Sequence, residues 1–361
     1  MLTESARGIA SSEIRHCVFD AHQQSSSTPS RMTTTLQHAM LGALVADAVA
    51  MPVHWYYDTR GLDQDYPALD GYAAPKNPHS GSILWRSKYK PRNQRGDILH
   101  DQAQYWGQRG IHYHQFLKAG ENTINFKLSV ELYQLICENS SYDAEQWLQR
   151  YIDRMLQPGW HRDTYLEEYH RAFFDNYAQG KAPLNCGIDD LHIGGLSHVP
   201  ALLAALEHIR VTELDAQIAT ATQHVQLTHR NQHVVRATEA FCRILAEVQN
   251  GNDLRAAIAE HGRAWATPSQ FDTWSLFEDR AVIGKHLTMA CYLPESFTAS
   301  LYLCWKYADN FSAGVLANAH CGGDNCHRGV VVGSLLAAAN GIDAHWLKEL
   351  QAVHDLNLSP A

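Results

Sequence analysis

Residues that could carry out chemistry are concentrated in the segment HCGGDNCHRGVVVGSLLAAANG, residues 320–341. Its first eight residues hold two cysteines, two histidines and one aspartate, and a smooth apolar run follows. Asp324 is a candidate helix N-cap, and Cys326 and His327 fall in the expected first turn. A structural zinc site needs four ligands at suitable spacing, and no second Cys or His pair in the chain matches one. A cysteine nucleophile at the helix N-terminus and a small buried cysteine both stay open.

A second candidate is Asp47, in the segment LVADAVAMPVHWYYD. A carboxylate near the C-terminal end of an apolar helix opposes the helix dipole and loses hydration, so a cation or a ring of donors should compensate it. The alternative is an exposed position on the wet face of the helix. His54 follows the proline that ends this helix, and Trp55, Tyr56 and Tyr57 come next, where side chains can line a pocket.

A third candidate is AGENTIN, residues 119–125, where Glu121, Asn122 and Thr123 fall in the first turn of the next expected helix. Oxygen atoms clustered at a helix start can bind a hard cation or form hydrogen bonds to a ribose. Ordinary helix capping is the alternative, because Glu and Asn are common at helix starts.

Helical periodicity dominates the elements that must position these groups. Apolar residues recur at helical spacing in the segments 33–52, 121–136, 198–209, 233–248 and 296–308. Alternating runs typical of strands are scarce. The sequence therefore predicts an all-α fold with a single domain over residues 32–361. Residues 1–31 are polar and partly rich in serine, which predicts a disordered N-terminal extension.

The irregular stretch between the first two expected helices, residues 55–108, is rich in Gly, Pro, Asn and Asp. A loop of that length in a compact domain is either functional or disordered. Its segment RSKYKPRNQR, residues 86–95, is either a grip for an anionic substrate or a solvated basic loop. The second interpretation is favoured because blocks of like charge are usually exposed.

Composition excludes several classes of function. The chain of 361 residues has a net charge of −9, which argues against nucleic-acid and anionic-membrane binding because both need a basic field. No uninterrupted apolar run reaches the roughly 20 residues that span a bilayer. Eight cysteines without a CxxC pair favour reduced thiols, so we expect a cytoplasmic, intracellular protein, with an organellar transit peptide left open.

Taken in order, GALVADAVAMPVHW, GENT and GGDNCHRGVVVGSLLAAANG resemble three motifs of the ADP-ribosylglycohydrolase family. This family includes ADP-ribosylarginine hydrolases, dinitrogenase-reductase-activating glycohydrolases and J-type crystallins, with motifs like G-D-A-x-G-x-P-x-E, T-D-D-T and G-G-D-T-D-T. THRNQHVVRA resembles the family's T-H helix start, and LNCGIDDLHIGGL falls where the family has a loop that holds ADP-ribose. The resemblance spans about residues 33–341 and implies a single-domain orthogonal helical bundle with its site at converging helix ends.

Members of the family hold two magnesium ions with oxygen ligands. The resemblance places the corresponding candidate ligands of this chain at Asp47, Glu121, Asp324 and Cys326. Several positions differ from the family pattern: Asn122 and Cys326 replace aspartates, His54 replaces a glutamate, Glu121 is one methylene longer than the family's aspartate, and Asn325 and His327 replace threonines. Magnesium prefers a hard oxygen shell, whereas thiol and imidazole are softer donors.

We therefore expect no family-type magnesium pair. The site is either empty or holds one divalent ion, bound through Asp47, Glu121 and Asp324. A softer ion such as zinc would instead use Cys326 with His54 or His327.

The resemblance predicts a hydrolase that cleaves the glycosidic bond of an ADP-ribosyl group or a related nucleoside. Its substrate would be an ADP-ribosylated protein or a small ADP-ribosyl metabolite. Residues expected to activate water or transfer protons are Glu121, Asp324, His54 and His327. Residues expected to bind the substrate are Asn122, Thr123, His192, Gly194, Gly195, Gly322, Gly323 and Asn325.

Two geometric expectations follow from this assignment. Backbone N–H groups of the Gly194–Gly195 turn should approach the pyrophosphate, and Asp47, Glu121 and Asp324 should line one cleft. The alternative function is a non-catalytic ADP-ribose binder or a crystallin-like structural protein, because a fold does not determine a function.

Overall fold

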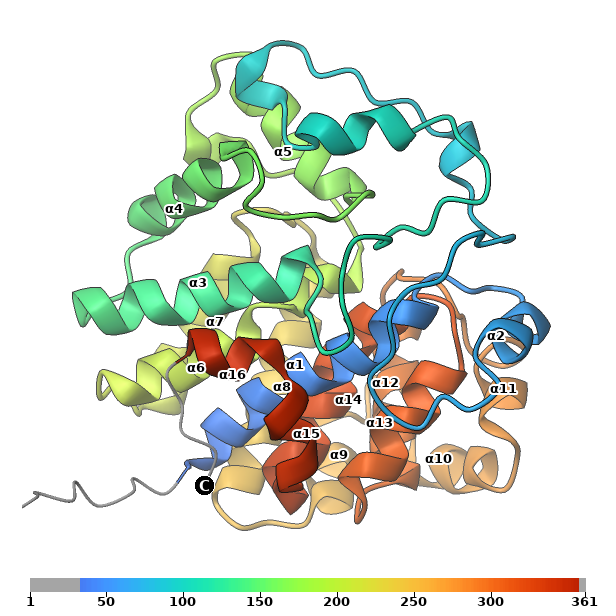
Figure 1. The fold of residues 1–361 in the computed structure, drawn as a ribbon. Helices are drawn as coiled ribbons and strands as arrows, with labels where there is room; N and C mark the ends of the chain where they lie inside the picture. Colours follow the sequence, from blue (N-terminus) through green and yellow to red (C-terminus); the bar gives the residue numbers. More distant parts are fainter. Residues whose placement is uncertain (1–32, 357–361) are drawn as a thin grey trace, which may run out of the picture. The chain divides into compact units, whose positions relative to one another are not determined.

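Helices make up the regular structure of residues 33–356, the part of the chain that the computed structural model describes (Figure 1). This part contains three isolated β-bridges and no strand. The all-α prediction is therefore confirmed. The expected N-terminal extension, residues 1–31, lies outside the described residues.

The described α-helices are α1 (Thr35–Ala50), α2 (Thr59–Asp65), α3 (Ile124–Asn139), α4 (Ala144–Leu156), α5 (Glu168–Ala178), α6 (Val199–His208), α7 (Leu214–Val225), α8 (Gln232–Gln249), α9 (Leu254–His261), α10 (Pro268–Ser275), α11 (Asp279–Val282), α12 (Glu295–Lys306), α13 (Phe311–His320), α14 (Asn325–Asn340), α15 (Ala344–Glu349) and α16 (Gln351–Asp355). The 3-10 helices are η1 (Met51–Val53), η2 (Leu84–Arg86), η3 (Gln94–Gly96), η4 (His100–Tyr105), η5 (Pro183–Asn185) and η6 (Ile193–Leu196). Each of the five segments predicted to be helical overlaps one α-helix, and these helices are α1, α3, α6, α8 and α12.

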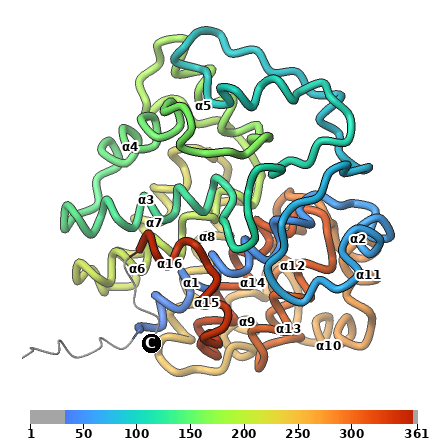
Figure 2. Tube along the Cα trace, in the orientation of Figure 1, coloured from blue at the N-terminus to red at the C-terminus, as the bar shows by residue number. Residues whose placement is uncertain are grey.

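Helices α1 and α14 form the centre of the fold, where α14 also packs against α8, α12 and α13 (Figure 1, Figure 2). Thr34 begins α1 with a capping box, in which its hydroxyl accepts the Gln37 N–H and the Gln37 side chain accepts the Thr34 N–H. The segment Thr35–Val53 has a mean hydropathy of 1.4, enough by length and composition to cross a membrane, but 89% of that window is buried inside the structure. This burial is typical of a core helix.

The contact between α1 and α14 is unusually close because a glycine on each helix faces the other. A Cβ atom added at Gly42 would lie 2.2 Å from the carbonyl oxygen of Gly333, and one added at Gly333 would lie 2.1 Å from the carbonyl oxygen of Gly42. One turn further along, a Cβ at Gly329 would lie 3.3 Å from Cβ of Ala46. The two helices are therefore antiparallel, and the C-terminal end of α1 lies against the N-terminal end of α14.

Helix α3 begins later than the sequence suggests. Its N-cap is Thr123 and its first residue is Ile124, so Glu121 and Asn122 precede the helix and do not lie in its first turn. The reason is that the backbone N–H and the hydroxyl of Thr123 both donate to the carboxylate of Asp47, which fixes Thr123 in an extended conformation.

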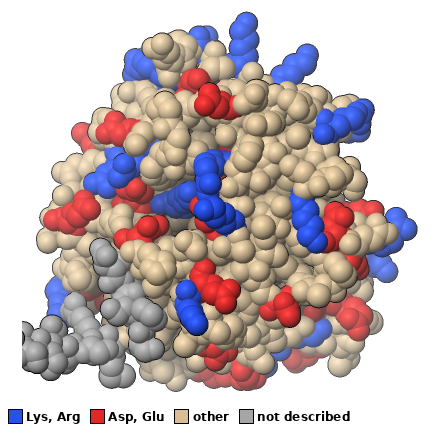
Figure 3. Space-filling model, in the orientation of Figure 1, with Lys and Arg blue, Asp and Glu red and all other residues tan. Residues whose placement is uncertain are grey.

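The long segment 55–108 is folded over the helices through aromatic and ionic contacts. It contains α2, η2, η3 and η4, and Trp55, Leu84 and Tyr113 form a small core of their own. In its basic part, Arg92 forms a surface ion pair with Asp175 of α5. On the face drawn in Figure 3, basic and acidic side chains are interspersed, so that face offers no extended surface of one sign.

We expect Gly333→Ala to lower the free energy of unfolding by about 1–3 kcal/mol, because the added methyl group overlaps the Gly42 carbonyl and forces the two helices apart. Chemical denaturation measures the change. Gly61→Ala is the control, since Gly61 lies in α2 with nothing within 4 Å of an added Cβ. It should leave stability unchanged or raise it by about 0.5–1 kcal/mol. Wild-type stability in Gly333→Ala would contradict the close helix contact.

Candidate active site

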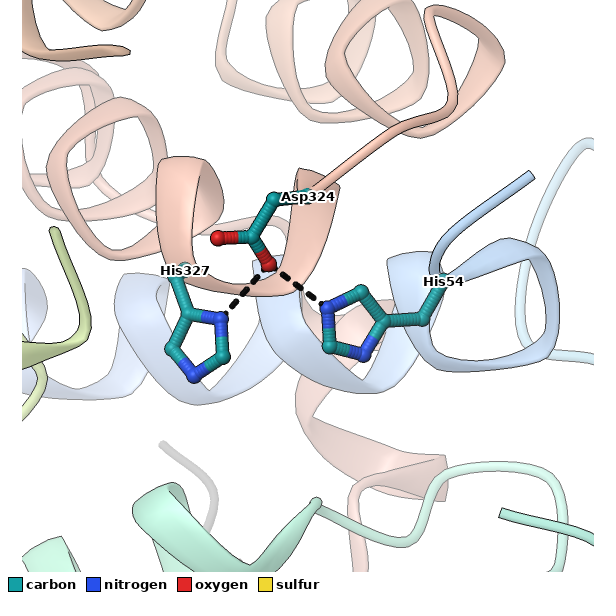
Figure 4. Close-up of side chains that lie close together, drawn as sticks. All are labelled: His54, Asp324 and His327. Carbon is teal, nitrogen blue, oxygen red and sulfur yellow. Dashed lines mark hydrogen bonds and ion pairs between the residues drawn. The ribbon is translucent and has the colours of Figure 1, made fainter. Parts of the chain in front are cut away.

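Asp324 is the centre of a buried cluster of acidic and histidine side chains (Figure 4). Its Oδ1 lies 2.7 Å from Nε2 of His54 and 2.7 Å from Nδ1 of His327. Its Oδ2 has no hydrogen-bond partner among the described residues and lies 3.7 Å from Nε2 of His192. His54 follows η1 at the end of α1, and Asp324 precedes α14. The antiparallel contact of the two helices therefore brings these residues together.

Asp324 occupies the N-cap position of α14, as the sequence predicts, but its side chain makes no capping hydrogen bond. The carboxylate is directed to the two histidines instead. Glu167 occupies the same position at the start of α5, also without a side-chain capping bond. Both carboxylates therefore lie at the positive ends of helix dipoles, which favours their ionised forms.

A second histidine extends the cluster beyond His54. Nδ1 of His54 lies 2.8 Å from Nε2 of His114, and Nδ1 of His114 lies 2.8 Å from Oδ1 of Asp163. None of these three residues is more than 2% exposed. An unbroken chain of close polar contacts thus runs from Asp163, in the loop before α5, to Asp324.

Glu167 lies on the other side of His327. Its Oε1 is 3.0 Å from Nε2 of His327 and accepts a hydrogen bond from Nδ2 of Asn125, also at 3.0 Å. Asn125 is fixed in turn because its Oδ1 accepts the Tyr169 hydroxyl at 2.8 Å and lies 2.9 Å from Nε2 of His170. Oε2 of Glu167 is buried without a hydrogen-bond partner among the described residues and lies 3.9 Å from Nε2 of His170.

Opposite charges decide the protonation of the cluster. Burial alone would raise the pKa of Asp324, but His327 and the hydrogen bonds from His327 and His54 hold it well below its usual value. Burial would also raise the pKa of Glu167, and the contact with His327 lowers it below the usual range. Burial favours neutral His327, but Asp324 and Glu167 outweigh it and raise the pKa of His327 to about 10. His54 contacts one carboxylate only, and burial lowers its pKa to about 3.

A pocket of about 240 Å³ opens beside this cluster. Its walls are largely aromatic: Trp55, Tyr57, Tyr113, Tyr165 and Tyr292. The polar residues that line it include Glu167, Asp190, His192 and Cys291. The ring of Trp55 stacks on the ring of His54 at 3.6 Å, so the aromatic wall is continuous with the Asp324 cluster. Tyr56 is not part of the wall, because it is buried and donates to Asp65.

Two groups of side chains here combine metal-ligand types at short range, with all ligand atoms of a group within 4.8 Å of one another. One group is His54, Asp324 and His327, and the other is His192, Cys291 and Asp324. Cys326, an expected ligand, belongs to neither. Its thiol lies in the contact between α1 and α14, where it donates to the Asp47 carbonyl at 3.6 Å and burial raises its pKa.

Asp47 is buried, and protein donors compensate its carboxylate. Thr123 donates its backbone N–H to Oδ2 at 2.8 Å and its hydroxyl to Oδ1 at 2.7 Å, while Nδ2 of Asn122 donates to Oδ2 at 2.9 Å. Burial nevertheless raises the pKa of Asp47. The alternative of an exposed Asp47 is therefore wrong, and the donors of Asn122 and Thr123 hold α1 to the start of α3.

Glu121 does not lie with Asp324. Nη2 of Arg162 is 2.5 and 2.6 Å from its two carboxylate oxygens, and the backbone N–H of Lys118 donates to Oε2. Glu121 lines a different hollow, together with Trp160 and Gln351 of α16 among others. The expectation that Asp47, Glu121 and Asp324 line one cleft is therefore wrong for Glu121, because the residue precedes α3 instead of lying in its first turn.

The N–H groups of Gly194 and Gly195 are already bonded inside the protein. Gly194 donates to Nδ1 of His192 at 2.8 Å, and Gly195 donates to the carbonyl of His192 at 3.1 Å. The expected approach of these N–H groups to a pyrophosphate is therefore not available in this conformation. His192 itself lines the pocket.

Gly322, Gly323 and Asn325 support the site from behind. Gly322 and Gly323 have φ angles of +63° and +62°, a conformation that favours glycine. The carbonyl of Gly323 accepts the Trp55 N–H at 2.8 Å, and Nδ2 of Asn325 donates to the carbonyl of Val53 at 3.2 Å. These bonds fix the backbone on both sides of His54.

Sequence reasoning does not identify His114, Asp163, Glu167 or Cys291 as site residues. One signal was present, because HYH (residues 112–114) and HRDTYLEEYH (residues 161–170) are dense in histidine, tyrosine and acidic residues. Their spacing matches no known ligand or catalytic pattern, however, and only the fold brings them to Asp324.

Converging helix ends that surround buried carboxylates and imidazoles in an all-α fold define the class of this protein. The chain belongs to the ADP-ribosylglycohydrolase family, whose model matches residues 29–359. Crystallin J1A of Tripedalia cystophora is 24% identical over 319 residues, which are 86% of this chain and 89% of that protein. A solved "ADP-ribosylglycohydrolase-related protein complex" has a TM-score of 0.56 and 18% identity over 90% of this chain and 94% of its own, so the two share a fold. The family resemblance seen in the sequence is confirmed.

We expect Asp47→Asn to lower the free energy of unfolding by about 1–3 kcal/mol, with or without magnesium in the buffer, because its amide group would face the Asn122 and Thr123 donors. Asp63→Asn is the control, since it removes a surface ion pair with Arg280 and should cost at most about 1 kcal/mol. A loss that occurs only when magnesium is present would identify Asp47 as a metal ligand instead.

Burial keeps many of the histidines neutral. It is the largest influence on the pKa of eight buried histidines and lowers each value: His54, His79, His112, His161, His170, His192, His224 and His229. His79 is the simplest case. Its ring stacks on Tyr56 at 3.9 Å, neither nitrogen has a hydrogen-bond partner among the described residues, and burial lowers its pKa to about 4.

The free energy of unfolding should therefore fall as the pH decreases from 6.5 toward about 4. In this range the histidines of the unfolded chain bind protons, whereas the buried rings of the folded protein stay neutral. His79 contributes at most about 1.4 kcal/mol per pH unit. His79→Phe keeps the stacking and removes the titrating group, so its free energy of unfolding should fall less steeply across this window. Denaturation at a series of pH values measures the slopes. Parallel curves for variant and wild type would contradict a neutral buried imidazole at this position.

Proposed function

We propose that the protein is a hydrolase that cleaves the bond between the anomeric carbon of an ADP-ribosyl group, or of a related nucleoside, and its leaving group. One observation carries the proposal: in a chain of the ADP-ribosylglycohydrolase family, the aromatic pocket opens directly on Glu167 and the Asp324 cluster. The substrate would be an ADP-ribosylated protein or a small ADP-ribosyl metabolite.

The aromatic walls suit a nucleoside. Nucleobases bind to proteins by stacking on aromatic side chains, which contributes about 1–3 kcal/mol per base. The pocket of about 240 Å³ is smaller than the roughly 300–1,000 Å³ that encloses a drug-sized ligand. The pocket would therefore enclose one part of an ADP-ribosyl group, with the remainder extending into solvent.

Two unpaired carboxylate oxygens supply the chemistry. Oδ2 of Asp324 and Oε2 of Glu167 are buried without partners among the described residues, and both carboxyl groups have lowered pKa values. Hydrolysis at an anomeric carbon passes through a transition state with positive charge on the sugar ring. Ionised carboxylates in a buried site stabilise that charge and can hold the attacking water. Glu167 lines the pocket, so we place it beside the sugar.

His54 and His327 fit a positioning role better than the proton-transfer role expected from the sequence. Both nitrogens of each ring are engaged within the cluster. The pKa of His54 is lowered to about 3 and that of His327 is raised to about 10, whereas a general acid or base works best with a pKa near the operating pH. We therefore assign both rings to the orientation of Asp324.

The residues present do not suit the magnesium pair that the family resemblance implies. The oxygens of Asp47 accept three hydrogen bonds, and Cys326 presents a buried thiol within the helix contact. Glu121 is paired with Arg162 at another hollow. Magnesium needs a shell of oxygen ligands, so the proposed reaction contains no step through magnesium.

A second candidate function is a structural protein or a binder of ADP-ribose without turnover. The similarity to Crystallin J1A over 86% of this chain favours it, because a crystallin has no need of catalysis.

We expect Glu167→Gln to lower the rate of ADP-ribose release by roughly 10² to 10⁴, because the variant keeps the shape of the side chain and loses the carboxylate. The assay uses a panel of ADP-ribosylated proteins and small ADP-ribosyl metabolites. Glu121→Gln is the matched control, since it makes the same chemical change outside the pocket, and it should leave the rate nearly unchanged.

An equal loss in Glu121→Gln would contradict this assignment and support the role predicted from the sequence. Wild-type protein that binds ADP-ribose but releases none from any member of the panel would favour the second candidate function.

A further inference from the structure

The hydrogen bonds behind His54 determine which of its nitrogens carries the lone pair. A neutral histidine has one N–H and one lone pair. Since ionised Asp163 only accepts hydrogen bonds, Nδ1 of His114 carries the proton, and Nε2 of His114 then accepts the Nδ1–H of His54. Nε2 of a neutral His54 is therefore left with a lone pair, which faces Oδ1 of Asp324 at 2.7 Å.

His327 faces the same oxygen of Asp324 from the opposite side, with its Nδ1 at 2.7 Å. Its Nε2 lies 3.0 Å from Oε1 of Glu167 and 3.0 Å from Nδ2 of Asn125. Because two carboxylates flank this ring, a proton on Nδ1 lies between His327 and Asp324 until a metal ion displaces it. The lone pair of His54 and the carboxylate oxygen still repel one another unless positive charge lies between them. One metal ion bound by both rings and Asp324 supplies that charge.

We propose that His54 Nε2, His327 Nδ1 and Asp324 bind one divalent transition-metal ion of the zinc class. Two imidazole nitrogens and one carboxylate form a donor set that suits zinc and its neighbours, whereas magnesium prefers oxygen alone. The three residues are at most 1% exposed, and their ligand atoms all lie within 4.8 Å of one another (Figure 4).

A small movement converts the hydrogen-bonded arrangement into a metal site. Ligand atoms of a tetrahedral zinc ion, with bonds of roughly 2.0–2.2 Å, are about 3.3 Å apart. Each imidazole nitrogen must therefore move about 0.6 Å away from Oδ1 of Asp324. The pocket side of the cluster, where Oδ2 of Asp324 lacks a partner among the described residues, leaves the fourth position open.

The outer partners of the two rings are those that metal-binding histidines use. Such histidines donate their second N–H to a carboxylate or another acceptor, which fixes the tautomer. Glu167 does this for His327, and His114 with Asp163 behind it does this for His54.

His192 is excluded as a ligand although it is close to Asp324. Its Nδ1 accepts the N–H of Gly194 at 2.8 Å, so Nε2, the nitrogen that faces Asp324, carries the proton of a neutral ring. A protonated nitrogen has no lone pair for a metal ion. His192 therefore provides a matched control, a histidine in the same pocket with the opposite tautomer.

The experiment measures binding to the full chain without any activity, so its result is independent of the proposed hydrolase function. Protein stripped of metal is titrated with Zn²⁺, with Co²⁺ as a spectroscopic substitute and with Mg²⁺. We expect one equivalent of Zn²⁺ by elemental analysis, a Tm that rises with Zn²⁺, visible absorption bands of Co²⁺ at a site of low coordination number, and no competition by Mg²⁺.

Three variants locate the site. His54→Phe should lower Zn²⁺ affinity by more than about 100-fold, and Asp163→Asn, which alters only the outer partner, should lower it by about 10–100-fold. His192→Phe should bind Zn²⁺ as the wild type does. Circular dichroism establishes that each variant is folded, and if His54→Phe is not, Asp163→Asn and His192→Phe carry the comparison.

Absence of stoichiometric Zn²⁺ binding by the wild type would overturn the proposal, as would two tightly bound equivalents of Mg²⁺. Wild-type affinity in folded His54→Phe, or an equal loss in His192→Phe, would show that the ion binds elsewhere or that the tautomer assignment is wrong.

Discussion

The close contact of α1 with α14 at Gly42 and Gly333 is the constraint on which the rest of the structure depends. Backbones that approach this closely leave no room for side chains between them, so the register of the two helices is fixed along their length. Because they are antiparallel, the residues after α1 meet the residues at the start of α14. Both His54 and Asp324 owe their position to a contact several turns away.

Oδ1 of Asp324 contacts both His54 and His327, and the remainder of the site surrounds these three side chains. Burial of ionised groups is costly unless opposite charge and hydrogen bonds accompany it. His327 lies between Asp324 and Glu167, and both carboxylates lie at helix N-termini, which together offset the cost. Three carboxylate oxygens of the cluster lack hydrogen-bond partners among the described residues, and two of them, Oδ2 of Asp324 and Oε2 of Glu167, lie at or beside the aromatic pocket. Unsatisfied groups in an otherwise paired cluster are typical of a functional site.

The site differs from the family pattern in a consistent direction. A thiol, two imidazoles and an amide stand at or near positions where the resemblance implies oxygen ligands, and the structure gives each of them a defined partner. Asn122 donates to Asp47, Cys326 lies in the helix contact, and His54 is oriented by His114. The fold of the family is thus retained, and we propose that nitrogen donors take the place of hard oxygen donors at its converging helix ends.

The sequence by itself determined the all-α fold and indicated candidate residues for the site, because both depend on local patterns. Apolar periodicity predicted α1, α3, α6, α8 and α12, and two short motifs indicated His54, Asp324 and His327 as candidate site residues. The sequence assigned Glu121 to the same cleft, but Glu121 lies elsewhere because α3 begins only at Ile124. That boundary depends on the hydrogen bond that Thr123 donates to Asp47 of α1.

Only the tertiary structure decided which side chains of the site contact one another. His54 and Asp324 are 270 positions apart, and Glu167 contacts His327 from a segment whose spacing matches no known ligand or catalytic pattern. Which nitrogen of each ring faces Asp324, and which carboxylate oxygens stay unpaired, depends on side chains brought together by packing. Such contacts cannot be predicted from local sequence, because they form, and stabilise the site, only after distant helices have packed together.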